Sequence, residues 1–529
     1  MTKPRVLISD ALSPAAVQIF KDRGVDVTFD PSLGKDKDKL AAIIGDYDGL
    51  AIRSATKVTA KLLESAKNLK VIGRAGIGVD NVDIPAATAK GVIVMNTPFG
   101  NSITTAEHAI AMMFALARQL PEADRSTQAG KWEKNRFMGV EITNKVLGLI
   151  GCGNIGTIVA ERAIGLKMRV IAYDPFLSPE RAVQIGVEKV ELEDLLHRAD
   201  FITLHTPLTE QTKNILSAEN IAKTKKGVRI INCARGGLID EEALAAALKS
   251  GHVAGAAIDV FTVEPAETSV LFGLPNVVCT PHLGAATTEA QENVALQVAE
   301  QMSDYLLRGA ISNAVNFPSI TAEEAPRLKP FVSLAEKLGS FLGQLTEAAV
   351  KGVRIEYSGA VGELNTRALT AAAVKGALQP FMPDINMVNA PLVAKEKGIL
   401  IEEVKSSAPS NVESLIKVQV LAEDMNRDAA GTVFQDGKPR VTEIRGIQMD
   451  AEFAPHMIYI RNDDKPGFVG RFGTVLGDAG VNIAIFNMGR AAPGGDAICF
   501  VSVDDVVTDE LLRNIEAIPM VKRARRLAF

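Results

Sequence analysis

Short apolar runs alternate with helical patterns from Arg5 to Phe317. The runs are too short for helices and fit buried strands, whereas the segments between them repeat apolar residues at helical spacing. This alternation predicts parallel sheets covered by helices. We expect one sheet from strands at 6–9, 25–29, 49–52, 71–73 and 92–95, and a second from strands at 146–150, 169–173, 201–204, 228–232, 253–259 and 277–280.

Two amphipathic helices are expected where the two sheets meet along the chain. Apolar residues recur at helical spacing from Ile103 to Arg118 and again from Thr287 to Arg308. Such helices are suited to joining two domains. Directly after the first helix, residues 120–145 are polar and irregular, so this stretch predicts a loop or a short helix. It contains Trp132, the only tryptophan.

The pattern changes at Phe317-Pro318. Residues 319–452 read as alanine-rich helices and further strands, without a catalytic motif. From His456 the order strand, turn, helix, two strands, helix, strand predicts a compact unit. The expected helices of the two parts are at 368–378, 389–397, 468–479 and 509–517, and the expected strands at 354–357, 399–404, 416–421, 441–453, 457–461, 482–488, 497–503 and 520–527.

A glycine-rich turn joins the strand at 146–150 to a helix. Gly151 allows the tight turn, Gly153 lets backbone approach a pyrophosphate, and Gly156 lets the helix pack against the strand. The helix N-terminus offers free N–H groups to phosphates. Asp174 ends the next strand, where a carboxylate accepts hydrogen bonds from a ribose diol and repels a 2′-phosphate. We therefore expect binding of NAD rather than NADP; a purely structural turn is the alternative.

Composition narrows the class of protein. The chain has 529 residues, which suggests several domains, and a net charge of −5, which gives no basic field for nucleic acid. No apolar run is long enough to cross a bilayer, and the N-terminus lacks the apolar block of a signal peptide. The four cysteines share no metal-ligand spacing. We expect a cytoplasmic protein without a metal, a nucleic-acid partner or a membrane.

Polar groups follow the strand ends of the first sheet. Arg53 and Ser54 come after one strand, and Arg74 and Gly76 come at the next. Ligands of open α/β sheets bind at the carboxyl ends of strands, and arginines there can hold an anion through two hydrogen bonds. These residues are candidates for substrate binding, against the alternative of solvated surface arginines.

Three residues of different chemistry follow strands of the second sheet: Arg235, Glu264 and His282. Hydride transfer from a secondary alcohol needs a base for the hydroxyl proton, and histidine suits this near neutral pH. A carboxylate beside the imidazole fixes its tautomer, and a guanidinium anchors a substrate carboxylate. We expect these three residues to meet at the cofactor edge of the sheet.

With these motifs, residues 5–317 resemble the D-isomer-specific 2-hydroxyacid dehydrogenases. The matching segments are 151–156 with Asp174, 232–236, 259–265 and 281–284. The resemblance implies that Arg235, Glu264 and His282 are the catalytic trio. The residues that it implies as NAD contacts, beside the glycines and Asp174, are Ile77, Asn154, Ile155, Thr206, Cys233, Ala234, Asp259, Leu283, Gly284 and Ala285.

Within that family, residues 73–83 and 96–101 resemble the branch that oxidises D-3-phosphoglycerate with NAD as the first step of L-serine synthesis. A phosphorylated substrate has two anionic ends, so cations beyond Arg235 are needed. The resemblance implies Arg53, Ser54, Arg74, Gly76, Asn101 and Arg136 as substrate contacts. Arg136 would act from its own or from a partner subunit. Two alternatives stay open. One is another 2-hydroxyacid dehydrogenase, which acts on glycerate, glyoxylate or 2-oxoglutarate, and the other is a non-enzymatic NAD sensor on the same fold.

Residues 456–529 resemble the ACT domain, a small βαββαβ ligand sensor. The resemblance implies L-serine as effector, bound by Asn462, Asp464 and Asn482, and a homodimer or homotetramer in which these domains pair. Ordinary turn chemistry is the alternative for these residues. The part at 318–453 would be an intervening regulatory domain or a spacer and oligomer contact.

The expected fold class is therefore α/β. Two doubly wound, Rossmann-like parallel-sheet domains are followed by two α+β regulatory domains, the last one ferredoxin-like. We expect a split substrate-binding domain (1–98 and 287–317), an NAD-binding domain (99–286), the intervening domain (318–453) and the ACT domain (454–529).

Overall fold

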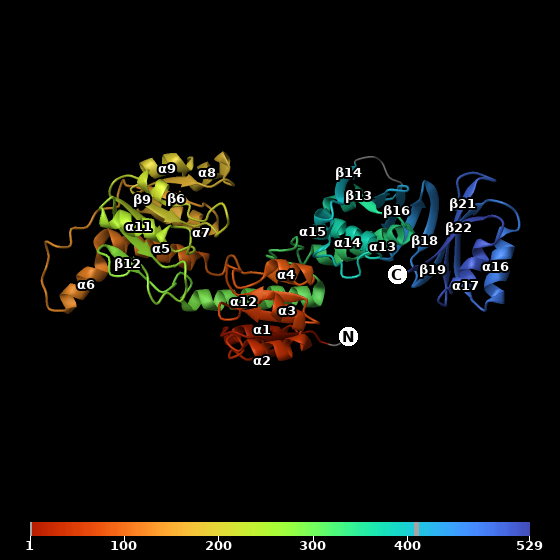
Figure 1. Ribbon diagram of the computed structural model, residues 1–529, viewed down its shortest axis with the longest axis horizontal. Coiled ribbons are helices and arrows are strands. Elements are labelled where there is room, and N and C mark those ends of the chain that lie inside the picture. Colours follow the sequence, from red (N-terminus) through yellow and green to blue (C-terminus); the bar gives the residue numbers. More distant parts are fainter. Residues whose placement is uncertain (1–2, 407–411) are drawn as a thin grey trace.

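The computed structural model describes residues 3–406 and 412–529, and within them the chain forms four sheets. Figure 1 shows the four sheet-based units in an extended row, with the C-terminal unit at the end opposite to the second sheet. The expected combination of two parallel α/β units and two α+β units is confirmed. Among the described residues, no helix is both long and apolar enough to span a membrane.

The first sheet is wholly parallel and has the order β2-β1-β3-β4-β5. Helix α12 (Thr288–Arg308) crosses it so closely that a Cβ on Gly73 would lie 2.2 Å from the sulfur of Met302. The strands are β1 (Arg5–Ile8), β2 (Asp26–Phe29), β3 (Gly49–Ile52), β4 (Val71–Arg74) and β5 (Ile93–Met95), and the helices are α1 (Pro14–Asp22), α2 (Lys37–Ile43), α3 (Ala60–Ser65) and α4 (Ile84–Ala89), with the 3₁₀ turn η1 (Ile44–Asp46).

The second sheet is also parallel, in the order β12-β11-β10-β9-β6-β7-β8. The strand order reverses between β6 (Val146–Ile150) and β9 (Phe201–Leu204), and ligands of such sheets bind in the crevice at this point. Separate apolar clusters cover the two faces. The other strands are β7 (Arg169–Tyr173), β8 (Glu188–Lys189), β10 (Val228–Asn232), β11 (Val253–Ile258) and β12 (Val277–Cys279), and the helices are α5 (Ser102–Arg118), α7 (Asn154–Gly165), α8 (Pro179–Ile185), α9 (Leu192–Arg198), α10 (Ala218–Ala222) and α11 (Glu241–Lys249).

An arm projects from this second unit (Figure 1). It consists of α6 (Leu120–Gln128) and the irregular segment after it, in line with the expected loop or short helix. Trp132 is 87% exposed and Met138 is 75% exposed. The arm thus presents large apolar side chains to solvent.

The third sheet is mixed, in the order β14-β13-β15-β16-β17-β18, and it packs against α13 (Glu324–Leu345) and α14 (Thr366–Leu378). The sequence pattern missed α13, because Pro330 and two glycines interrupt its apolar period, and it missed β16, which is rich in small residues. The remaining elements are α15 (Ala390–Glu396), η2 (Ala360–Glu363), β13 (Val350–Gly359), β14 (Leu400–Ser406), β15 (Ser414–Ala422), β16 (Arg427–Val433), β17 (Pro439–Ile444) and β18 (Ile447–Glu452).

The fourth sheet is antiparallel with the order β20-β21-β19-β22, the arrangement expected of a βαββαβ unit. Its core continues into the third unit, because Phe341 of α13 packs its ring edge-on against Tyr459 and Phe500. The elements are β19 (His456–Asp463), α16 (Phe468–Asp478), β20 (Ile483–Arg490), β21 (Asp496–Val503), α17 (Asp509–Glu516) and β22 (Val521–Ala528).

Glycines let α13 and α14 pack with their backbones in close approach. A Cβ on Gly339 would lie 2.1 Å from the carbonyl oxygen of Ala373, and one on Gly376 would lie 2.1 Å from that of Glu336. We expect Gly376→Ala to force the helices apart and to destabilise this unit by about 1–3 kcal/mol. Hydrogen exchange of the α13 amides measures the loss of protection.

Gly473→Ala in α16 is the matched control, because no atom lies within 4 Å of the Cβ position there. Alanine forms helix better than glycine by about 1 kcal/mol, so this variant should keep or gain stability. Unchanged protection of α13 in Gly376→Ala would contradict the close-packing argument.

Candidate active site

The glycine turn after β6 has the geometry of a phosphate cradle. Gly151 has φ +96°, and a Cβ on Gly156 would lie 2.2 Å from the carbonyl oxygen of Gly151. Gly153 is exposed and has no atom within 4 Å of its Cβ position. Asn154 and Ile155 begin α7 directly after it. Two glycines are therefore required by packing, and the third leaves open the space at the helix N-terminus where phosphates bind.

Asp174 lies at the end of β7 and is tied to the glycine turn. Its carboxylate accepts hydrogen bonds from the backbone N–H groups of Cys152 at 2.8 Å and Phe176 at 2.8 Å. A carboxylate has about four lone-pair directions, so it can still accept from a ribose hydroxyl. Its position therefore fits the predicted contact with the cofactor ribose.

The end of β9 faces the same turn. The hydroxyl of Thr206 and Nδ1 of His205 are buried and have no hydrogen-bond partner among the described residues. Burial lowers the pKa of His205 to about 4, so its imidazole is neutral near pH 7. Buried polar atoms are normally satisfied, and an open hydroxyl at the strand switch fits a polar ligand such as a dinucleotide. The predicted contact at Thr206 is consistent with this.

Asn232 shapes the turn after β10. Its side chain accepts from the N–H of Ala234 at 3.0 Å and donates to the carbonyl oxygen of Arg235 at 2.9 Å. Cys233 is buried within this turn, and burial raises the pKa of its thiol. The thiol therefore stays protonated and serves packing, while Arg235 projects from the strand end.

Asp259 fixes the turn after β12. Although burial opposes its ionisation, hydrogen bonds from His108, Thr280 and Leu283 hold the pKa of Asp259 below its usual value. Its carboxylate accepts from the N–H of Leu283 at 2.7 Å and of Gly284 at 2.9 Å. Asp259 thus supports the turn of residues 282–285, which includes Ala285, besides its predicted contact with NAD.

Glu264 and His282 form a direct pair. Nδ1 of His282 lies 2.6 Å from Oε2 of Glu264, and the N–H of Phe261 donates to Oε1 of Glu264 at 3.0 Å. Because Glu264 is acceptor-only when ionised, His282 carries the proton on Nδ1 and leaves Nε2 as the acceptor. His282 has φ +56°, and its side chain is 47% exposed. The imidazole is thus accessible to a substrate.

Arg235 meets the first unit rather than the histidine in the contacts observed. Its Nε donates to Asp80 at 3.0 Å, and its Nη1 donates to the carbonyl oxygen of Ala234 at 2.7 Å. A Cβ on Gly78 would lie 1.8 Å from Nη2 of Arg235. Asp80 is not among the site residues predicted from the sequence, although it lies within the motif at 73–83.

The strands place the trio on one edge. Arg235 follows β10, Glu264 follows β11 and His282 follows β12, and these three strands are neighbours in the sheet. Their carboxyl ends share the edge that carries the glycine turn. The arrangement places an imidazole, its carboxylate partner and a guanidinium at the edge that carries the glycine turn.

Cations gather at the strand ends of the first sheet. Burial and the neighbouring Arg235 lower the pKa of Arg74 to about 10, and Arg53 acts in the same direction. Nε of Arg74 is buried without a partner among the described residues. A buried guanidinium that lies close enough to two others to be repelled by them fits a ligand with more than one negative charge.

Other predicted substrate contacts differ in their placement. Gly76 has φ +141°, and a Cβ there would collide with the guanidinium of Arg74. Asn101 is buried with a free side-chain oxygen, whereas Ser54 is exposed. The carbonyl oxygen of Ile77, the predicted backbone contact to NAD, accepts from the side chain of Asn96 at 2.7 Å.

Arg136 lies on the arm, where its guanidinium donates to Glu133 at 3.1 Å. Figure 1 shows this arm, which includes α6, on the side of the second unit away from the first sheet. The structure of this single chain therefore does not bring Arg136 to the guanidinium cluster.

The predicted effector residues are engaged within the C-terminal unit. Asn462 is fully buried and accepts from the thiol of Cys499 at 3.6 Å. Asp464 accepts from Arg490 and from the N–H of Gly494, both at 3.0 Å. The amide of Asn482 donates to Asp504 at 2.7 Å. Asp464 and Asn482 flank the two ends of α16, whereas Asn462 faces the core.

Comparison with known families matches three segments of the chain. Residues 110–284 match the D-isomer specific 2-hydroxyacid dehydrogenase, NAD binding domain. Residues 327–445 match the D-3-phosphoglycerate dehydrogenase intervening domain, and residues 456–519 match the ACT domain. The chain binds NAD through the first of these segments.

Similar proteins match over almost the whole chain. The D-3-phosphoglycerate dehydrogenase of Synechocystis is 42% identical over 99% of this chain and 94% of its own length. That of Bacillus subtilis is 42% identical over 97% of this chain and 98% of its own. Among solved structures, a glyoxylate reductase from Paecilomyes thermophila is 30% identical with a TM-score of 0.56, covering 60% of this chain and 99% of the other.

Asp174 gives a test of the cofactor site. We expect Asp174→Ala to relax the discrimination against NADP, because the carboxylate that repels a 2′-phosphate is lost. The ratio of kcat/KM with NAD to kcat/KM with NADP measures the change. Asp194→Ala, at an exposed position of helix α9, is the control. An unchanged ratio in Asp174→Ala would remove the role of this carboxylate in cofactor choice.

Proposed function

Because the chain belongs to the D-3-phosphoglycerate dehydrogenases, a branch of the D-isomer-specific 2-hydroxyacid dehydrogenases, we propose that it oxidises D-3-phosphoglycerate to 3-phosphohydroxypyruvate with NAD. This reaction would be the first step of L-serine biosynthesis. The observation that carries the proposal is the 2.6 Å contact between His282 and Glu264 at the edge of the NAD-binding sheet.

Three side chains of this protein have separate roles in the proposed reaction. Nε2 of His282 accepts the proton of the C2 hydroxyl. The Nδ1–H group of His282 stays hydrogen-bonded to Glu264, and this bond holds the ring in place. Bound NAD supplies the hydride acceptor at the same edge. Arg235 holds the substrate carboxylate and stabilises the negative charge that develops on the C2 oxygen.

The guanidinium cluster supports a phosphorylated substrate. With Arg235 on the carboxylate, Arg53 and Arg74 remain for the phosphate; Gly76 lies in the loop after β4, and Asn101 directly precedes α5. The unpartnered Nε of Arg74 is a further donor for such a group. Ser54 stays a candidate contact, and Arg136 would act from a partner subunit.

A reductase of a small unphosphorylated 2-oxoacid is the second candidate, favoured by the likeness to a glyoxylate reductase. A substrate panel with and without phosphate separates the two. The chosen substrate is the one that gives the larger kcat/KM.

Regulation and assembly belong to the same proposal. The ACT unit suggests control by a small molecule, and we take this molecule to be L-serine bound near Asn462, Asp464 and Asn482.

The exposed arm supports a homodimer or homotetramer. The four cysteines are free, in keeping with a cytoplasmic protein. The domain limits stay at 1–98 with 287–317, 99–286, 318–453 and 454–529.

His282→Ala tests the chemistry. We expect kcat to fall by roughly 10²–10⁴ because the acid/base group is lost, while NAD binding is kept. NADH formation with 3-phosphoglycerate measures kcat, and calorimetry measures NAD binding. His197→Ala on α9 is the control. Turnover near the parent value in His282→Ala would end the proposed role.

L-serine should raise the melting temperature, as any ligand of the native state does. Millimolar serine is added to the full chain and to Asn482→Ala, with D-serine as the control ligand. We expect the melting temperature to rise only when L-serine is added to the parent protein, and not with D-serine or in Asn482→Ala. The absence of a shift in the parent protein would leave the ACT unit without this effector.

A further inference from the structure

The loop that carries Glu264 has little apolar support. Phe261 and Leu271 are buried at its two ends, but most residues between them are exposed. Exposed loops with few buried contacts open easily. A hydrogen bond between Glu264 and His282 would then depend on what else holds the loop.

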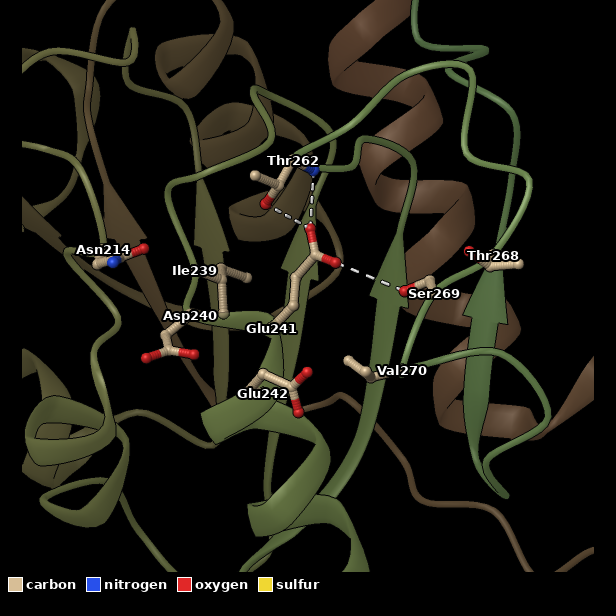
Figure 2. A pocket seen from close by; sticks show the side chains of 9 residues that line it. All are labelled: Asn214, Ile239, Asp240, Glu241, Glu242, Thr262, Thr268, Ser269 and Val270. Atoms are coloured by element: carbon tan, nitrogen blue, oxygen red, sulfur yellow. Dashed lines mark hydrogen bonds between the residues drawn. The ribbon is translucent and has the colours of Figure 1, made fainter.

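Glu241, the first residue of α11, holds this loop from outside. Its Oε1 accepts from the N–H of Thr262 at 2.8 Å and from the hydroxyl of Thr262 at 2.7 Å, and its Oε2 accepts from Ser269 at 3.5 Å. Figure 2 shows the carboxylate reaching up between the two ends of the loop. Bonds to an ionised acceptor are stronger than neutral ones.

The bonds of Glu241 and Glu264 interlock. Two consecutive backbone N–H groups each donate a hydrogen bond to a different carboxylate: that of Phe261 to Glu264, and that of Thr262 to Glu241. Among the described residues, Glu241 and His282 are the side chains outside residues 261–271 that the structure bonds to this loop. Holding the N–H of Thr262 therefore also restrains the preceding N–H of Phe261, which is the donor that orients Glu264.

Neighbouring acids do not share this role. Asp240 accepts from the N–H of Ala243 and caps α11, and Glu242 is exposed. Both line the cavity of about 590 Å³ beside the loop, together with Glu241. They lie in the same cavity without a hydrogen bond to the loop, so Glu242 provides a matched control.

We propose that Glu241 is a positioning residue for catalysis: it clamps the loop at Thr262 and Ser269 so that Glu264 stays in register with His282. This inference rests on the proposed function, because it assumes that the pair of Glu264 and His282 works in the reaction. Glu241 does not itself touch the reacting groups. What matters is the reach of its acceptor oxygen to Thr262.

Three substitutions separate reach from charge. Glu241→Gln keeps an oxygen at the same reach and should hold kcat within about threefold. Glu241→Asp keeps the charge at the start of α11 but withdraws the acceptor by one carbon, and Glu241→Ala removes it; both should lower kcat roughly tenfold, as expected for a misplaced acid/base partner. KM for NAD should stay unchanged in all three, and Glu242→Ala should match the parent.

A double-mutant cycle with Glu264→Gln completes the test, with melting temperatures recorded for every variant. If Glu241 acts through Glu264, then Glu241→Ala adds no further loss in the Glu264→Gln background. Equal losses of kcat in Glu241→Gln and Glu241→Asp, or additive losses in the cycle, would overturn the positioning role. Full kcat in Glu264→Gln alone would overturn the proposed catalytic pair instead, so the two failures are distinguishable.

Discussion

The buried carboxylate of Asp259 is the constraint on which the site depends. It follows β11 and accepts hydrogen bonds from Thr280, Leu283 and Gly284, all of which follow β12. Its backbone oxygen also accepts from the N–H of His282 at 2.9 Å. Because one residue binds both flanks of His282, the left-handed conformation of that histidine is fixed before any ligand arrives. An uncharged residue at 259 would lose the strong acceptor that makes this possible.

The two parallel units are joined through the site as well as through helices. Asp80 belongs to the first unit and binds Arg235 of the second at 3.0 Å. The guanidiniums of Arg74 and Arg53 lie near this pair. Repulsion among these cations is only partly balanced by Asp80 and Asp10. A doubly anionic ligand would relieve this repulsion.

The sequence predicted the parallel sheets well, because buried parallel strands are continuous apolar runs with little ambiguity. It also predicted that Arg235, Glu264 and His282 follow strands and lie near the cofactor edge of one sheet, because the carboxyl ends of parallel strands share an edge; that these strands are the neighbours β10, β11 and β12 comes from the structure. It could not reveal Glu241, whose contacts with Thr262 and Ser269 depend on how a loop folds back. Helix α13 was missed for a related reason: the glycines that break its apolar period are explained only by α14, packed against them.

The arm that holds Trp132 has an optical consequence. The chain contains a single tryptophan, and this residue is 87% exposed and belongs to none of the apolar clusters of the described residues. Intrinsic indole fluorescence of this protein therefore reports the surroundings of the arm and is nearly blind to the unfolding of the four sheets. An indole that becomes covered by another protein surface emits further to the blue, so the emission maximum would report any assembly that buries Trp132.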